Sequence, residues 1–185
     1  MKKLVLAAVL ALAAAAMVVA VATAKNGNGH GGGKALHAHI DGYQEVPTLS
    51  SDGQGKFRAK IRDGSVEFKL SYSGLTTAVA AAHIHLGRPA VNGGVIAFLC
   101  GGTKPACPAS GEVTGTIVPA DVVGPAAQGI DPGEFDEFVR ALKANATYVN
   151  VHTGEYENGE IRGQIGGGHG HRFGHGHGGK DHDRD

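Results

Sequence analysis

The stretch from residue 35 to residue 165 is dominated by short segments in which apolar and polar side chains alternate. Alternation places the two kinds of side chain on opposite faces of a β-strand. In 55–61, for example, Phe57, Ala59 and Ile61 share one face. Asp63-Gly64 is typical of a two-residue hairpin turn. Eight such segments predict a mainly β fold, an antiparallel β-sandwich with Greek-key-like connections: 35–40, 55–61, 65–72, 80–86, 94–100, 112–118, 147–152 and 160–165.

One segment has a helical period instead. The apolar positions of 131–145 recur at i, i+3, i+4 and i+7, as Phe135, Phe138, Val139 and Leu142. Asp131 is a suitable N-cap, Pro132 fits the first helical position, and Glu134 lies three residues after the cap. The pattern predicts one amphipathic helix over 131–145, packed on the edge of the sandwich.

The N-terminus has the composition of a signal peptide. Lys2 and Lys3 precede an unbroken apolar run over 4–21, and Ala22-Thr23-Ala24 follows as a small-x-small cleavage site. An uncleaved membrane anchor is the alternative, since about 18 apolar residues can span a bilayer. We predict cleavage after residue 24, a mature chain that starts near Lys25, and no membrane association afterwards. The expected location is extracellular or extracytoplasmic, in the periplasm or envelope of a bacterium.

Charge and composition define the remaining parts of the chain. Lys+Arg and Asp+Glu both number 17, so removal of the two N-terminal lysines leaves 15 − 17 = −2. This balance argues against nucleic acid as a partner. Gly and Asn dominate 25–34, which we predict to be a flexible linker, and Gly and His dominate 166–185, which we predict to be a disordered tail.

Cys100 and Cys107 are the two cysteines of the chain. In an oxidising compartment a pair this close is most simply a local disulfide. A cysteine metal site is the alternative, but the spacing is not the C-x-x-C type.

The globular region resembles the CHRD domain, a module found in chordin and in bacterial secreted proteins. The resemblance covers about 35–165 and rests on patches in the order of the family. These are 41–47 (DGYQEVP), 72–75 (YSGL), 81–87 (AAHIHLG), 124–125 (GP), 128–130 (QGI), 148–153 (YVNVHT) and 159–165 (GEIRGQI). It implies a secreted β-sandwich-like module with no established catalytic activity.

Histidines are the main chemical feature of this region. His83 and His85 are two residues apart on a predicted strand, so they project from the same face. Two such imidazoles can ligate one metal ion, as in the His-x-His strand of copper/zinc superoxide dismutases. His152 is the best third ligand and Glu160 a possible fourth, and copper or zinc suits this set. The alternative is a structural network in which these side chains hydrogen-bond to backbone or carboxylates.

Other candidates have weaker signals. Glu45 is expected to pin its loop, with metal ligation as the alternative. His37 and His39 share a face of the first strand, as surface residues or as an extension of a metal-binding surface. The tail offers further imidazoles that can capture a divalent ion: His169, His171, His175, His177 and His182.

No nucleophile or paired-carboxylate constellation is recognisable, so a non-enzymatic role is expected. The sequence predicts an exported module that presents a binding surface to an extracellular protein, a glycan or a metal ion. The alternative is a metal-dependent redox enzyme centred on His83, His85 and His152.

Overall fold

A computed structural model of the chain describes residues 34–109 and 111–167. The predicted signal peptide (1–24), nearly all of the predicted linker and most of the predicted tail lie outside these ranges. The eight predicted strands are all confirmed, with ends that differ by one or two residues. They are β1 (Ala35–Asp41), β2 (Gln54–Arg62), β3 (Ser65–Ser73), β4 (Val79–Leu86), β5 (Val95–Cys100), β6 (Gly111–Ile117), β7 (Thr147–Thr153) and β8 (Ile161–Gly167).

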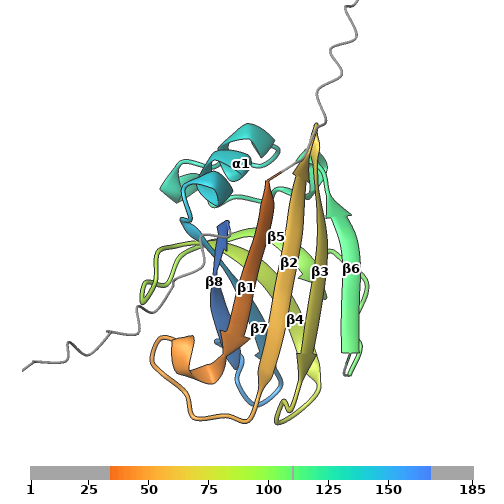
Figure 1. Cartoon of the computed structure of the whole chain (residues 1–185), viewed down its shortest axis with the longest axis vertical. Helices are drawn as coiled ribbons and strands as arrows, with labels where there is room; N and C mark the ends of the chain where they lie inside the picture. The colour runs from red at the N-terminus through yellow and green to blue at the C-terminus, as the bar shows by residue number, and fades with distance from the viewer. Residues whose placement is uncertain (1–33, 110, 168–185) are drawn as a thin grey trace, which may run out of the picture. The chain divides into compact units, whose positions relative to one another are not determined.

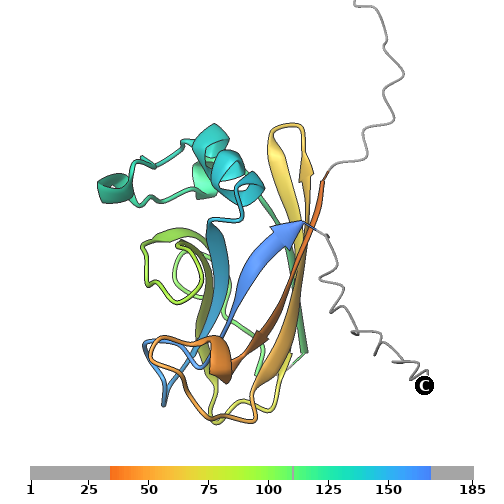
Figure 2. The same ribbon diagram turned by 60° about the vertical axis from the view of Figure 1, so that its left-hand side comes forward.

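The strands form one antiparallel sheet in the order β5-β4-β7-β8-β1-β2-β3-β6. The sheet is nearly closed, because its two end strands, β5 and β6, contact each other. The predicted sandwich is therefore made by a single sheet that folds over. β1, β2, β3 and β6 form one layer, and β7, β4 and β5 lie behind it (Figure 1). Figure 2 shows the two layers from the side.

The core fills the space between these layers. Each strand directs alternate apolar side chains inward, as the pattern predicts, and Phe57, Leu70, Ile84 and Val149 are fully buried. The register of β2 with β3 is set by the Asp63-Gly64 turn, where Arg62 pairs with Ser65. Gly64 has a φ of 68°, a left-handed conformation that glycine adopts without strain.

Short helical segments connect the strands. Three 3₁₀ turns, η1 (Gly42–Gln44), η2 (Pro119–Asp121) and η3 (Ala126–Gln128), accompany one α-helix, α1 (Phe135–Lys143). The helix was predicted over 131–145, and its start at Asp131 is wrong. Gly133, with a φ of 87°, breaks the helical backbone, and Glu134 occupies the N-cap instead. The apolar stripe is confirmed, since Phe138 and Leu142 are fully buried.

The disulfide is also confirmed. Cys100, at the end of β5, is bonded to Cys107. Within the described ranges, no helix is long and apolar enough to cross a membrane.

Candidate metal centre

The pairing of β4 with β7 brings three predicted ligands together. Residues separated by more than sixty positions in the chain become neighbours, because His83 pairs with Asn150 and His85 with Tyr148. His152 lies two residues further along β7, on the same face. Each of the three histidines offers one nitrogen, and these nitrogens all lie within 4.8 Å of one another.

β4 presents both histidines on the outer face of the sheet. Ala82 and Ile84, which alternate with them, are fully buried in the core. The pairing of β4 with β5 shifts register next to each histidine, between Ala82 and His83 and between Ile84 and His85. Such irregularities re-aim side chains beside functional sites. The rings of His83 and His85 lie 5.4 Å apart, so the expectation of one shared face is confirmed.

Backbone carbonyls set the proton positions of two rings. His85 Nδ1 lies 3.0 Å from the carbonyl oxygen of Gly93, and His152 Nδ1 lies 2.9 Å from that of Glu157. A carbonyl only accepts, so both Nδ1 atoms donate and both Nε2 atoms carry a lone pair when the rings are neutral. Metal-binding histidines are commonly held in this way by the nitrogen that does not bind the ion.

His83 completes the cluster. Its Nδ1 lies 3.2 Å from His152 Nε2, which is an acceptor in the tautomer just described. The Nε2 atoms of His83 and His85 are buried and have no hydrogen-bond partner among residues 34–109 and 111–167. Buried polar atoms without partners are rare, and an absent water or ion is one usual explanation.

Burial keeps the three rings neutral. It lowers the pKa of His83 to about 3, with further lowering by the neighbouring His152 and His85. The pKa of His85 falls to about 4, again mainly through burial and despite the hydrogen bond to Gly93. Burial also lowers the pKa of His152. Neutral imidazole is the form that binds metal ions.

The distances between the histidine nitrogens suit a small first-row metal ion. Zinc–nitrogen bonds of about 2.0–2.1 Å in a tetrahedral site place ligand atoms roughly 3.3 Å apart. The separation of 3.2 Å between His83 Nδ1 and His152 Nε2 matches this value. Without an ion His83 Nδ1 donates to His152 Nε2, so binding of an ion by both atoms requires the His83 proton to move to Nε2. The widest separation, 4.8 Å, requires small side-chain rotations to close around an ion.

A comparison of the sequence with models of known protein families found a match over this domain. A family model described as the CHRD domain matches residues 36–165. The chain belongs to the CHRD family. A search of curated proteins found no match. The CHRD family is generally non-enzymatic, and its domains, together with the disulfide, are consistent with an extracellular protein.

Glu160 of the CHRD domain is placed apart from the histidines. Its buried carboxylate accepts hydrogen bonds from Ser51 Oγ at 2.6 Å, Thr76 Oγ1 at 2.9 Å and Thr153 Oγ1 at 2.8 Å. Burial raises its pKa, but these hydrogen bonds outweigh that effect and the net pKa is lowered. Glu160 therefore ties the loop before β2 and the β3–β4 connection to the end of β7.

A stack of three side chains, which the sequence did not predict, supports His85. The ring of Tyr148 lies 4.8 Å from the ring of His85 and almost parallel to it, at 9°. The guanidinium carbon of Arg162 lies 3.5 Å from the centre of the same tyrosine ring. Since β4 and β8 flank β7 on opposite sides, the histidine and the arginine cover the two faces of Tyr148.

Arg162 also shapes the loop that holds His85. Its guanidinium donates hydrogen bonds to the carbonyl of Arg88 at 3.1 Å, the carbonyl of Val91 at 2.7 Å and Asn92 Oδ1 at 3.0 Å. This loop ends at Gly93, whose carbonyl accepts from His85. Arg162 thus fixes His85 both through Tyr148 and through the loop.

Glu45 lies beside this network. It is 6% exposed, and its pKa is raised to about 7 because burial outweighs the charge of Arg162 and the backbone hydrogen bond from Val46. A Cβ at Gly159 would lie 2.7 Å from Glu45 Oε1 and 2.5 Å from Asn150 Oδ1. In the part of the chain that the structure describes, neither of these two oxygens has a hydrogen-bond partner. Glycine at 159 is therefore what lets the two side chains approach.

The other histidines lie elsewhere. His37 and His39 are exposed on β1, where His39 Nδ1 lies 3.2 Å from Asp41 Oδ2. Tail residues His169, His171, His175, His177 and His182 lie outside the described ranges.

Proposed function

We propose that this protein is an exported, non-enzymatic CHRD module that binds one divalent metal ion, copper or zinc, through His83, His85 and His152. One observation carries the proposal. Three neutral imidazoles converge with unprotonated nitrogens, and backbone carbonyls hold the Nδ1 protons of two of them. A purely structural network has no need to leave two buried Nε2 atoms without partners.

The donor set favours copper or zinc. Imidazole suits both ions, whereas magnesium and calcium prefer oxygen ligands. Three histidines leave a fourth position for water or for a group from a partner. That open position also favours the alternative, a metal-dependent redox enzyme, which predicts that the copper-loaded protein consumes superoxide.

Export is supported by the N-terminal sequence, by the disulfide and by the family. The Gly/His tail adds a second, weaker site in this proposal. Its imidazoles, in a segment whose composition predicts disorder, would collect ions without the geometric selection that the strands impose.

Metal analysis and calorimetric titration test the proposal on the chain shortened to end at Gly167, which removes the tail histidines. We expect one zinc or copper ion per chain. His83→Ala and His152→Ala should each abolish that binding, because two imidazoles cannot supply three bonds. His37→Ala is the matched control, since it removes an exposed histidine from the same sheet.

Circular dichroism establishes that each variant is folded. Absence of binding to the folded wild-type domain would contradict the proposal, and so would binding that survives both substitutions. Superoxide consumption by the copper-loaded wild type, lost in His152→Ala, would favour the enzyme instead.

A further inference from the structure

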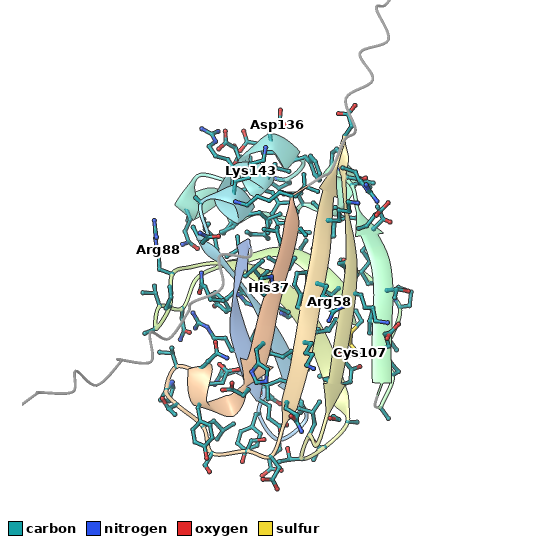
Figure 3. All side chains as sticks on the ribbon, viewed as in Figure 1. His37, Arg58, Arg88, Cys107, Asp136 and Lys143 are labelled. Carbon is teal, nitrogen blue, oxygen red and sulfur yellow. A yellow bond between two sulfur atoms is a disulfide. The ribbon has the colours of Figure 1, made fainter. Side chains whose placement is uncertain are left out.

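A second feature of the molecule is the outer face of β1 and β2. Lys56, Arg58 and Lys60 alternate along β2 and point outward, while Phe57 and Ala59 between them are buried. On β1, His37 pairs with Arg58 and His39 with Lys56. Figure 3 shows His37 and Arg58 side by side on this open layer, which α1 does not cover. Five basic side chains therefore share one exposed patch, which we call the β2 face.

The charges of the β2 face are only partly balanced: His39 lies 3.2 Å from Asp41, and Lys60 stands opposite Glu67 in the ladder. Nearby acids are already paired, Glu67 with Arg62 and Glu112 with Lys69. Within the described part of the chain, Lys56, Arg58 and Lys60 have no carboxylate within 4.0 Å. Arg58 has basic neighbours on both sides, since it pairs with His37 on β1 and with Lys69 on β3.

This arrangement has an energetic cost. Like charges directly opposite each other destabilise a sheet. The formal net charge of the chain is zero, so the excess here reflects segregation of charge within the molecule. A bound polyanion would remove the repulsion.

The face continues into a hollow with polar walls. His37 and His39 line it together with Gln44 and Gln164. Gln44 is exposed, so its side chain is accessible to a bound hydroxyl. Gln44 and Gln164 also line an adjoining hollow that reaches Tyr43. Tyr43 is 68% exposed, the most exposed large apolar side chain of the described residues.

We infer that the β2 face and this hollow bind an acidic polysaccharide, a chain of uronate sugars. The carboxylates pair with Lys56, Arg58 and Lys60, whose outward positions repeat about every 6.8 Å along an extended strand. Sugar hydroxyls hydrogen-bond to the exposed side chain of Gln44, and the apolar side of one ring packs on Tyr43, since tyrosine offers a flat, amphipathic surface. The inference requires export but does not depend on the metal centre.

The combination of groups favours a sugar over other polyanions. Phosphate polymers would use the basic side chains alone. An exposed amide side chain, Gln44, and an exposed aromatic ring, Tyr43, which line the adjoining hollows, match a polyhydroxylated ring.

Binding of polygalacturonate to the chain from Lys25 to Asp185 tests the inference. The titration is done in EDTA, because uronates and the proposed metal centre both take divalent ions. Polyphosphate and neutral dextran are the comparison polymers. We expect binding to polygalacturonate that weakens as salt is added and no binding to dextran.

The variant K56Q/R58Q/K60Q should bind polygalacturonate roughly tenfold or more weakly, because three charge contacts are lost. R88Q/R140Q/K143Q is the matched control, with the same change in net charge. Arg88 lies on the loop between β4 and β5, and Lys143 lies on α1. Both are away from the β2 face (Figure 3). Y43A should weaken polygalacturonate binding and leave polyphosphate binding unchanged.

Three results would overturn the inference: no binding of polygalacturonate at low salt, equal losses in the two triple variants, or equal affinity for polyphosphate together with no effect of Y43A. Because EDTA keeps the histidines free of metal, these results bear on the β2 face and leave the proposed metal centre to its own test.

Discussion

The clearest prediction concerns how metal affinity depends on pH. An ordinary histidine, with a pKa of about 6.5, is roughly 90% protonated at pH 5.5. A site of three such ligands therefore binds about a thousandfold more weakly at pH 5.5 than at pH 7.5, since each ring must lose its proton first.

The buried cluster should behave differently. Burial holds the pKa of His83 near 3 and that of His85 near 4. At pH 5.5 less than about 5% of either ring carries a second proton. The pKa of His152 is lowered as well. Because all three pKa values are lowered, zinc affinity should fall much less between pH 7.5 and 5.5 than it does for three ordinary histidines.

Competition with a chromophoric zinc chelator measures this dependence. The chain that ends at Gly167 is compared with a peptide of residues 168–185, at pH 7.5, 6.5 and 5.5. We expect the affinity of the domain to fall far less than that of the peptide, which should fall steeply. A parallel decline in both would refute the assignment of neutral, buried ligands.

Four further outcomes concern stability. Zinc at a hundred times its Kd should stabilise the domain by about 2.7 kcal/mol, and His152→Ala should remove that shift in a thermal melt. Replacing Cys100 and Cys107 by Ser should lower the free energy of unfolding by about 2.5 kcal/mol, from loop entropy, as urea titration would show. Phe138→Ala empties a fully buried position of α1 and should cost about 3–5 kcal/mol. For the metal-free domain, the lowered pKa of His85 contributes stability above pH 6.5 that is lost toward pH 4. His85→Phe should therefore reduce the fall in unfolding free energy between pH 7 and 5 by about 1–2 kcal/mol, and an unchanged slope would contradict this.

The strands were predictable because each carries its own pattern. Alternation along Phe57, Ala59 and Ile61 and the Asp63-Gly64 turn are local signals, and β2 and β3 lie where these signals place them. The predicted start of α1 was wrong because the left-handed backbone of Gly133 prevents a helix from beginning at Asp131 and Pro132. Capping residues indicate a helix start only when the intervening backbone is helical.

The candidate site was predictable in part. The spacing of His83 and His85 is enough to place both on one face of a strand. The partners of those rings depend on which strands become neighbours, which local patterns do not specify. Arg162 is a possible partner of the histidines in the alternative of a structural network, but its stacking on Tyr148 and its hydrogen bonds to the loop before Gly93 were not predicted.

The stack on Tyr148 gives the protein an intrinsic optical reporter. The chain contains no Trp and 4 Tyr, so its ultraviolet emission comes from tyrosine alone. One of these fluorophores lies against a proposed ligand ring, at 4.8 Å. A paramagnetic ion such as Cu²⁺ at the cluster would quench that emission, while diamagnetic Zn²⁺ at the same position would leave it bright.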